Sequence, residues 1–175
     1  MLILASQSPR RREILSQLGI QFECRPSGVD ESKEPRPSNP KELPQVLADA
    51  KAKDISLKYK NRFVLGSDTV VFAGNKVLEK PSDLSEAKEM LLSLSGKQHS
   101  VISAVSLFKN GQAVFRHAET TQVLFRNLSE SEILEYIQNE EVLDKAGSYG
   151  IQEKGARFVK SIQGCYFNVM GLPVQ

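Results

Sequence analysis

The sequence predicts an α/β protein that folds as one compact domain, and three observations support this fold class. The chain has 175 residues, and a single domain commonly holds about 100–200 residues. Strand-like and helix-like segments alternate along it, starting with a short apolar run at 2–5. A second apolar run, 63–66, is continuous, as is typical of a central strand with both faces buried. Such a chain is long enough to bury a core of two or three layers.

Composition and the N-terminus exclude several classes of protein. Hydrophobic residues make up 40% and charged residues 25% of the chain, which is typical of a globular protein. No run approaches the about 20 apolar residues that a membrane-spanning helix needs, and the first residues lack the basic start of a signal peptide. Cys24 and Cys165 have no CxxC spacing, and with His99 and His117 they form no zinc-ligand pattern. We therefore expect a reduced, cytoplasmic protein.

The charge of the chain is small but unevenly distributed. A net charge of +2 is too small for a protein that coats nucleic acid or a membrane surface. Residues 1–60 hold 11 Lys and Arg against 8 Asp and Glu, whereas residues 62–175 hold 12 against 13. We therefore expect a local positive field near the N-terminus that suits a small anionic ligand, and neither nucleic acid nor a membrane as a partner.

Capping and turn residues divide the chain into helices and strands. Ser8 caps a helix that has Pro9 at its first position and ends at Gly19. The patterns up to residue 78 predict a strand at 20–24, a proline-rich loop at 26–44, a helix with an apolar stripe of Leu43, Val46, Leu47, Ala50 and Leu57, a strand ending at Asp68, and a hairpin at 70–78. Two further helices are begun by Asp83 with Glu86 and by Ser129 with Glu132. The remaining patterns predict strands within 99–126 that turn at Asn110-Gly111, a loop at 144–150, and short strands near 158–159 and 166–169.

The first helix carries a candidate phosphate site. Arg10, Arg11 and Arg12 lie in its first turn, where unpaired backbone N–H groups already make the end of a helix electropositive. Cations are favourable there when an anion is bound, and Ser6 and Ser8 can donate hydrogen bonds to it. A solvated basic patch, with Ser8 acting only as a cap, is the alternative.

Asp68 is the candidate for proton transfer or metal binding. It follows an apolar strand, and open α/β sheets bind their ligands at the carboxyl ends of strands. An aspartate with an ordinary pKa is a weak base at neutral pH, so a divalent metal beside it would help. Asp30-Glu31 could supply further oxygen ligands. The alternatives are a turn or cap residue for Asp68 and a solvated acidic pair for Asp30-Glu31.

Three further polar residues are candidates for substrate contacts. Lys51 lies near the apolar stripe of its helix, and Lys80 lies between Glu79 and Pro81. Lysines in such places usually extend to water. Gln152 follows a glycine-flanked loop, and its amide offers the donor and acceptor that match N3–H and O4 of uracil or thymine. An ordinary surface glutamine is the alternative.

Blocks of motif residues along the whole chain resemble the Maf family of nucleoside triphosphate pyrophosphatases, also known as septum formation inhibitors. The blocks are Ala5-Ser6-Gln7-Ser8-Pro9-Arg10-Arg11, Gly66-Ser67-Asp68-Thr69-Val70, Glu79-Lys80-Pro81, Leu94-Ser95-Gly96 with His99, residues 144–152, and Asn168-Val169-Met170-Gly171-Leu172-Pro173. They occur in family order and span residues 1–175 as a single domain.

The resemblance implies a mixed twisted sheet with flanking helices, in two lobes around a central cleft, similar to the inosine triphosphate pyrophosphatases. It also implies hydrolysis of a nucleoside triphosphate to the monophosphate and pyrophosphate with a divalent cation, Mg²⁺ or else Mn²⁺ or Co²⁺. The form of residues 144–152 resembles the branch that takes dTTP and UTP. The alternative is a non-catalytic nucleotide-binding regulator of cell division.

Roles for individual residues follow from the same resemblance. Asp68 matches the catalytic proton acceptor. Glu31 matches an acidic position beside the metal, and Asp68 is assigned as a second metal-binding residue. The positions that line the triphosphate are Ser6, Arg11, Lys51 and Lys80, and those associated with base choice are Arg10, Thr69 and Gln152.

Two features depart from the family pattern. Family chains commonly continue past Gly171-Leu172-Pro173 with another helix, so we expect packing or dimerisation through that helix to differ here, and a homodimer is left open. Ser67 stands where alanine is more usual before the catalytic aspartate, and we expect this small change to be tolerated.

Overall fold

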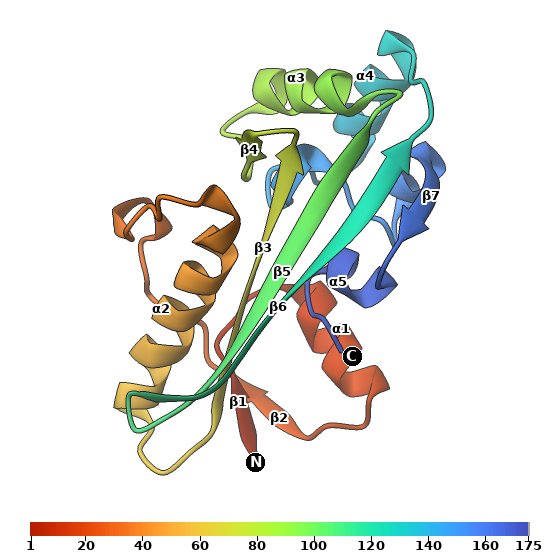
Figure 1. Cartoon of the computed structure of the whole chain (residues 1–175). Helices are drawn as coiled ribbons and strands as arrows, with labels where there is room; N and C mark the ends of the chain where they lie inside the picture. Colours follow the sequence, from red (N-terminus) through yellow and green to blue (C-terminus); the bar gives the residue numbers. More distant parts are fainter. Residues whose placement is uncertain (175) are drawn as a thin grey trace. The chain divides into compact units, whose positions relative to one another are not determined.

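A computed structural model of the protein describes residues 1–174 and shows a mixed sheet flanked by helices (Figure 1). Within these residues, seven strands form one sheet in the order β2-β1-β3-β5-β6-β7, with β4 paired to β3. The strands are β1 (Leu2–Leu4), β2 (Phe22–Cys24), β3 (Val64–Ala73), β4 (Lys76–Leu78), β5 (Gln98–Lys109), β6 (Gln112–Phe125) and β7 (Val159–Gln163). The α-helices are α1 (Pro9–Gln17), α2 (Leu43–Lys58), α3 (Leu84–Leu94), α4 (Glu130–Asn139) and α5 (Tyr166–Met170). The predicted mixed α/β fold is confirmed.

The chain divides into two compact units. The first contains Met1–Thr69, Ser103–Glu119 and the C-terminal stretch from Gly171, and the second contains Val70–Ile102 and Thr120–Met170. The single domain and the central cleft that the resemblance implies stay predictions.

Close packing of a helix on a strand shapes the first unit. Strand β1 pairs in parallel with β2 and with β3, and α1 and α2 lie on opposite sides of these strands (Figure 1). Gly66 allows α2 to approach β3 closely, because a Cβ at this position would overlap the carbonyl oxygen of Ala48 on α2. The apolar core of this unit includes Ile3, Ala5, Ala52, Ile55, Val64 and Phe108.

The second unit confirms the predicted helix starts. The Asp83 side chain accepts a hydrogen bond from the Glu86 backbone N–H at 2.8 Å, and Ser129 and Glu132 form a reciprocal capping box. A cluster of buried aromatic rings includes Tyr149 from the loop at 144–150; its other members are His99, Phe125, Tyr136 and Phe158. Within residues 1–174, no helix combines the length and the apolar character needed to cross a membrane.

Three expectations about elements are wrong. Strand β3 does not end at Asp68 but continues to Ala73, because its later residues pair with β4. The stripe of α2 does not include Leu57, which is 49% exposed, since the buried face of the helix includes Lys51 instead. Leu43 and Leu47 are buried as the pattern predicts, but a charged residue is excluded from an apolar stripe by its type, so the pattern continued to Leu57 and not through Lys51.

The third wrong expectation concerns residues 166–169, which form helix α5 and not a strand. The hydroxyl of Thr121 ends the strand pairing just before this helix, because it donates to the backbone oxygen of Cys165 and accepts from its N–H. The buried Asn168 then fixes the helix by donating to Val101 O and Thr121 Oγ1.

Candidate active site

The candidate site of the first unit lies where β1 ends and β3 continues. Leu4 is the last residue of β1 in register with β3, and the Ala5 N–H makes one more bond to Leu65 O at 2.8 Å. The chain then leaves the sheet towards α1, so Asp68 and Thr69 follow on a part of β3 that β1 no longer covers. This position is the carboxyl end of a parallel strand, next to a helix N-terminus, where α/β sheets bind ligands.

Arg11 is held in place by three segments of the first unit. Its Nε donates to Gly171 O at 2.8 Å, its Nη1 to Ser6 Oγ at 3.2 Å, and its Nη2 to Thr69 Oγ1 at 3.1 Å. These bonds use one N–H of each nitrogen, so Nη1 and Nη2 each keep a further donor for a ligand. Burial lowers the pKa of Arg11, and the negative charge of Asp68 opposes this shift.

Lys51 lies between two carboxylates. Its Nζ is 2.6 Å from Asp68 Oδ1 and 2.8 Å from Glu31 Oε1. The side chains of Lys51 and Asp68 are only 10% and 9% exposed. Burial raises the pKa of Asp68, while the charges of Lys51 and Arg11 act in the opposite direction. A buried aspartate that is shifted upward is a better proton acceptor near neutral pH than an exposed one.

The two carboxylates of Glu31 and Asp68 supply some, but not all, of the ligands that a hard divalent cation needs. Glu31 and Asp68 already converge on one positive charge, the ammonium of Lys51, and carboxylate oxygens are the ligands that Mg²⁺ prefers. Within residues 1–174 no group of three or more acidic, histidine or cysteine residues could hold a metal. Mg²⁺ is usually bound by one or two carboxylates, with water and substrate phosphates completing its shell. The residues present therefore suit a cation that is shared with a phosphate group.

Five of the predicted site residues thus come together in the first unit, from three different elements and a loop: Ser6, Arg11, Lys51, Asp68 and Thr69, with Glu31 joined to them through Lys51. Arg10 lies in the same first turn of α1, and its positive charge contributes to the lowered pKa of Arg11.

Lys80 and Gln152 belong to the second unit, and their part in the site stays a prediction. Lys80 is exposed and follows β4. The Gly147 N–H donates to Glu79 O at 3.2 Å, which ties the loop before Gln152 to the segment that carries Lys80. Within residues 1–174, the Oε1 atom of Gln152 is buried and has no hydrogen-bond partner, as a group that awaits a ligand would be.

The positioning roles of three further groups were not predicted from the sequence. Ser103 Oγ lies 2.8 Å from Thr69 Oγ1, and Ser67 Oγ donates to the Gly171 oxygen at 3.0 Å. That oxygen also accepts from Arg11. Ser103 was visible only as a polar residue within a strand pattern, and a backbone oxygen carries no signal in the sequence at all.

Comparisons with known proteins point to one family. The chain is 45% identical over 174 residues to a dTTP/UTP pyrophosphatase of Geobacillus sp. (strain WCH70), a match that covers 99% of this chain and 92% of that one. It is 46% identical over 173 residues to the protein of the same name from Vibrio cholerae, with coverage of 99% and 92%. Among solved structures it is similar to a HAM1 protein from Coxiella burnetii, with 15% identity, a TM-score of 0.44 and coverage of 71% and 72%.

A family model described as Maf-like protein matches residues 1–175. With relatives of this similarity along nearly all of its length, the chain belongs to the Maf family.

Proposed function

We propose that the protein hydrolyses nucleoside triphosphates of the dTTP and UTP type, including modified pyrimidine nucleotides, to the monophosphate and pyrophosphate, and that it does so in the cytoplasm. The observation that carries this proposal is the buried Asp68 beside the anchored cations Arg11 and Lys51. Phosphoryl transfer requires positioned positive charge and a group that activates water, and this cluster offers both. Relatives that are 45–46% identical are named dTTP/UTP pyrophosphatases, which supports the choice of substrate.

In the proposed mechanism, water attacks the α-phosphorus and Asp68 accepts its proton. Arg11 donates to the phosphate oxygens through the N–H groups that the protein leaves free, and Ser6 and Lys51 lie beside it. Glu31 and Asp68 would hold a divalent cation, Mg²⁺ or else Mn²⁺ or Co²⁺, which would supply charge neutralisation on the phosphates. Lys80 is proposed as a further phosphate contact.

Base choice is proposed to involve Arg10, Thr69 and Gln152. The amide of Gln152 can donate to O4 and accept from N3–H of a uracil or thymine ring, and its Oε1 is the buried acceptor described above. A single methyl group in an apolar pocket changes binding by only about 1–3 kcal/mol. The protein should therefore accept dTTP and UTP together.

The proposed function is tested by measuring pyrophosphate release from a panel of pyrimidine and purine triphosphates, with and without Mg²⁺. We expect release from dTTP and UTP that depends on the cation, and much slower release from dATP and dGTP. Tight binding of dTTP without any release would overturn the proposal and favour a nucleotide-binding regulator. Release from purine triphosphates at the same rate would overturn the base choice alone.

A further inference from the structure

The ammonium of Lys51 occupies the place between Glu31 and Asp68 where a shared cation would be held. It lies 2.6 Å from one carboxylate and 2.8 Å from the other. Lys51 itself is only 8% exposed, so its ammonium is largely removed from water and depends on these carboxylates for its charge partners. The two carboxylates depend on it in turn, since like charges at this spacing repel each other.

An ammonium and a divalent cation cannot share this place. Both require the oxygens of Glu31 and Asp68, and both carry positive charge, so binding of one excludes the other at close range. A nucleoside triphosphate changes this balance because it brings new anionic oxygens. The lysine stem is flexible enough to exchange a carboxylate for a phosphate partner.

We propose that Lys51 is an internal competitor of the divalent cation, which keeps the free protein from binding metal until a triphosphate gives the ammonium another partner. The inference rests on the proposed function, because it takes Glu31 and Asp68 as the metal-binding carboxylates. Its consequence is ordered binding. Free Mg²⁺ can reach the same two carboxylates, but it binds to them together with the nucleotide and not before it.

The size of the effect follows from the population of the competing state. If the ammonium occupies the carboxylates for about nine-tenths of the time or more, the apparent affinity for the cation falls by about tenfold or more. Removing the ammonium should restore the lost affinity for the cation. The variant Lys51→Met keeps the length and apolar stem of the side chain but carries no charge.

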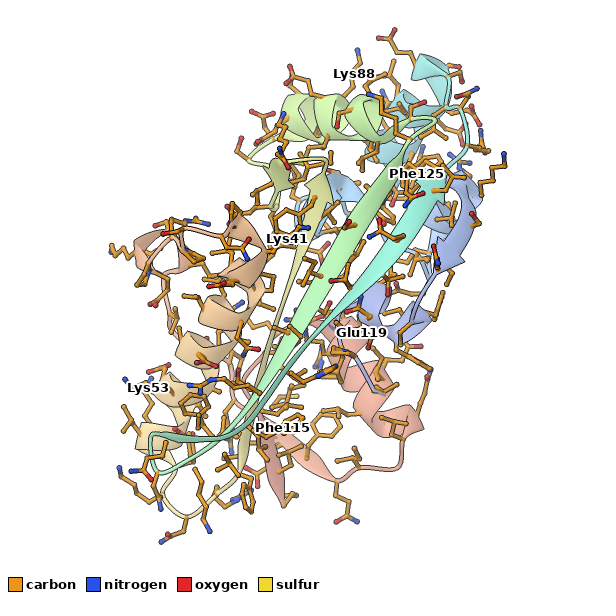
Figure 2. All side chains as sticks on the ribbon, in the orientation of Figure 1. Lys41, Lys53, Lys88, Phe115, Glu119 and Phe125 are labelled. Atoms are coloured by element: carbon orange, nitrogen blue, oxygen red, sulfur yellow. The ribbon has the colours of Figure 1, made fainter. Side chains whose placement is uncertain are left out.

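The first experiment measures Mn²⁺ binding to the nucleotide-free protein by electron paramagnetic resonance, with calorimetry of Mg²⁺ in parallel. We expect Lys51→Met to bind Mn²⁺ about tenfold more tightly than the wild type. The matched control is Lys53→Met, which removes the same charge from the same helix. Lys53 lies on the outer side of α2 and is exposed (Figure 2). Equal affinity in wild type and Lys51→Met, or an equal gain in both variants, would overturn the proposal.

A second measurement does not depend on whether Lys51→Met folds. In the wild type, the ¹⁵N resonance of a buried, ion-paired lysine ammonium can be followed by nuclear magnetic resonance. Mg²⁺ alone should leave the Lys51 signal in place, whereas Mg²⁺ with a non-hydrolysable dTTP analogue should shift it. A shift produced by Mg²⁺ alone at low millimolar concentration would contradict the competition.

The outcomes separate this inference from the proposed function. Pyrophosphate release by the wild type is measured in the same preparations. If the wild type hydrolyses dTTP and Lys51→Met gains no metal affinity, the competition fails and the function stands. If no triphosphate is hydrolysed, the proposed function is wrong, but the Mn²⁺ affinities of the wild type and Lys51→Met still test the competition by Lys51.

Discussion

At the scale of single residues, the burial of Asp68 is the property that separates it from the other acidic residues of the chain. Its side chain is 9% exposed and touches the ammonium of Lys51. An exposed aspartate would be a weak base, but burial raises the pKa of Asp68 towards the range in which a carboxylate accepts protons well. The ion pair with Lys51 keeps the charged form available.

Replacing Asp68 tests this role directly. Asp68→Asn preserves the shape of the side chain, and Lys51 retains Glu31 as a partner, so we expect a folded protein. General-base catalysis commonly contributes about 10²–10⁴-fold, and kcat for dTTP should fall by that order. Binding of a non-hydrolysable analogue should change far less. A variant with kcat within a fewfold of the wild type would show that Asp68 is not the proton acceptor.

At the scale of elements, the segment after α5 positions helix α1 through a backbone oxygen. Gly171 has a φ of +117°, and its oxygen accepts hydrogen bonds from both Ser67 and Arg11. A Cβ at Gly171 would lie 3.2 Å from Thr69 Oγ1 and 3.6 Å from Arg11 Nε. Position 171 therefore favours glycine for its backbone and for the space beside Thr69, whose hydroxyl accepts from Arg11.

Gly171→Ala should weaken substrate binding as well as stability. A left-handed backbone costs roughly 1–2 kcal/mol for an L-residue, and displacement of the Thr69 hydroxyl, which accepts from Arg11, should raise KM for dTTP several-fold. The matched control is Gly74→Ala, because Gly74 also has a positive φ, +60°, but nothing within 4 Å of its Cβ position. The control should lower the thermal midpoint and leave KM unchanged. A similar KM in both variants would contradict the positioning role.

Elements with local signals could be predicted, and those that depend on distant partners could not. The start of α1 follows from Ser8 and Pro9, which satisfy or remove backbone N–H groups within the helix itself. Helix α5 depends on Thr121, which is far away in the sequence and ends the strand by side-chain bonding. The end of β3 was misplaced because its later pairing with β4 was read as a separate hairpin.

The candidate site shows the same division. Asp68 could be proposed from its carboxylate and its place after an apolar strand, whereas the role of Lys51 came from the resemblance to the Maf family. Their arrangement was not predicted, since the sequence does not show that Lys51 Nζ lies between two carboxylates. Ser103 contacts Thr69 and the Gly171 oxygen contacts Arg11 and Ser67, so their part in the site depends on these neighbours and could not be predicted from their own residue type.

At the scale of the whole molecule, stability should depend on the protonation of one buried histidine. His99 is 2% exposed, and its Nε2 lies 2.8 Å from the hydroxyl of Tyr149. Burial lowers the pKa of His99 from 6.5 to about 4. The folded protein therefore holds the neutral ring, while the unfolded chain takes up a proton below about pH 6.5.

Stability should consequently be fully present above pH 6.5 and fall as the pH decreases towards 4. The shift corresponds to a loss of about 3 kcal/mol of unfolding free energy from this group. Urea denaturation between pH 7 and pH 4 measures it. His99→Gln should show a flatter dependence in this window, whereas His117→Gln, at the other and exposed histidine, should follow the wild type. Parallel slopes for wild type and His99→Gln would rule out His99 as the cause.

The bond between Arg11 and the Gly171 oxygen also orders the events of synthesis. The two residues are 160 positions apart, and a ribosome makes the arginine long before the glycine. Helix α1 can form early from its own cap, and Arg11 can then bond to Ser6 and Thr69, but its third anchor is missing until residue 171 has emerged. Contacts of such long sequence separation form late in folding. A chain translated only as far as α5 would therefore lack the contact that completes the anchoring of Arg11, and the candidate site of the first unit would still be incomplete.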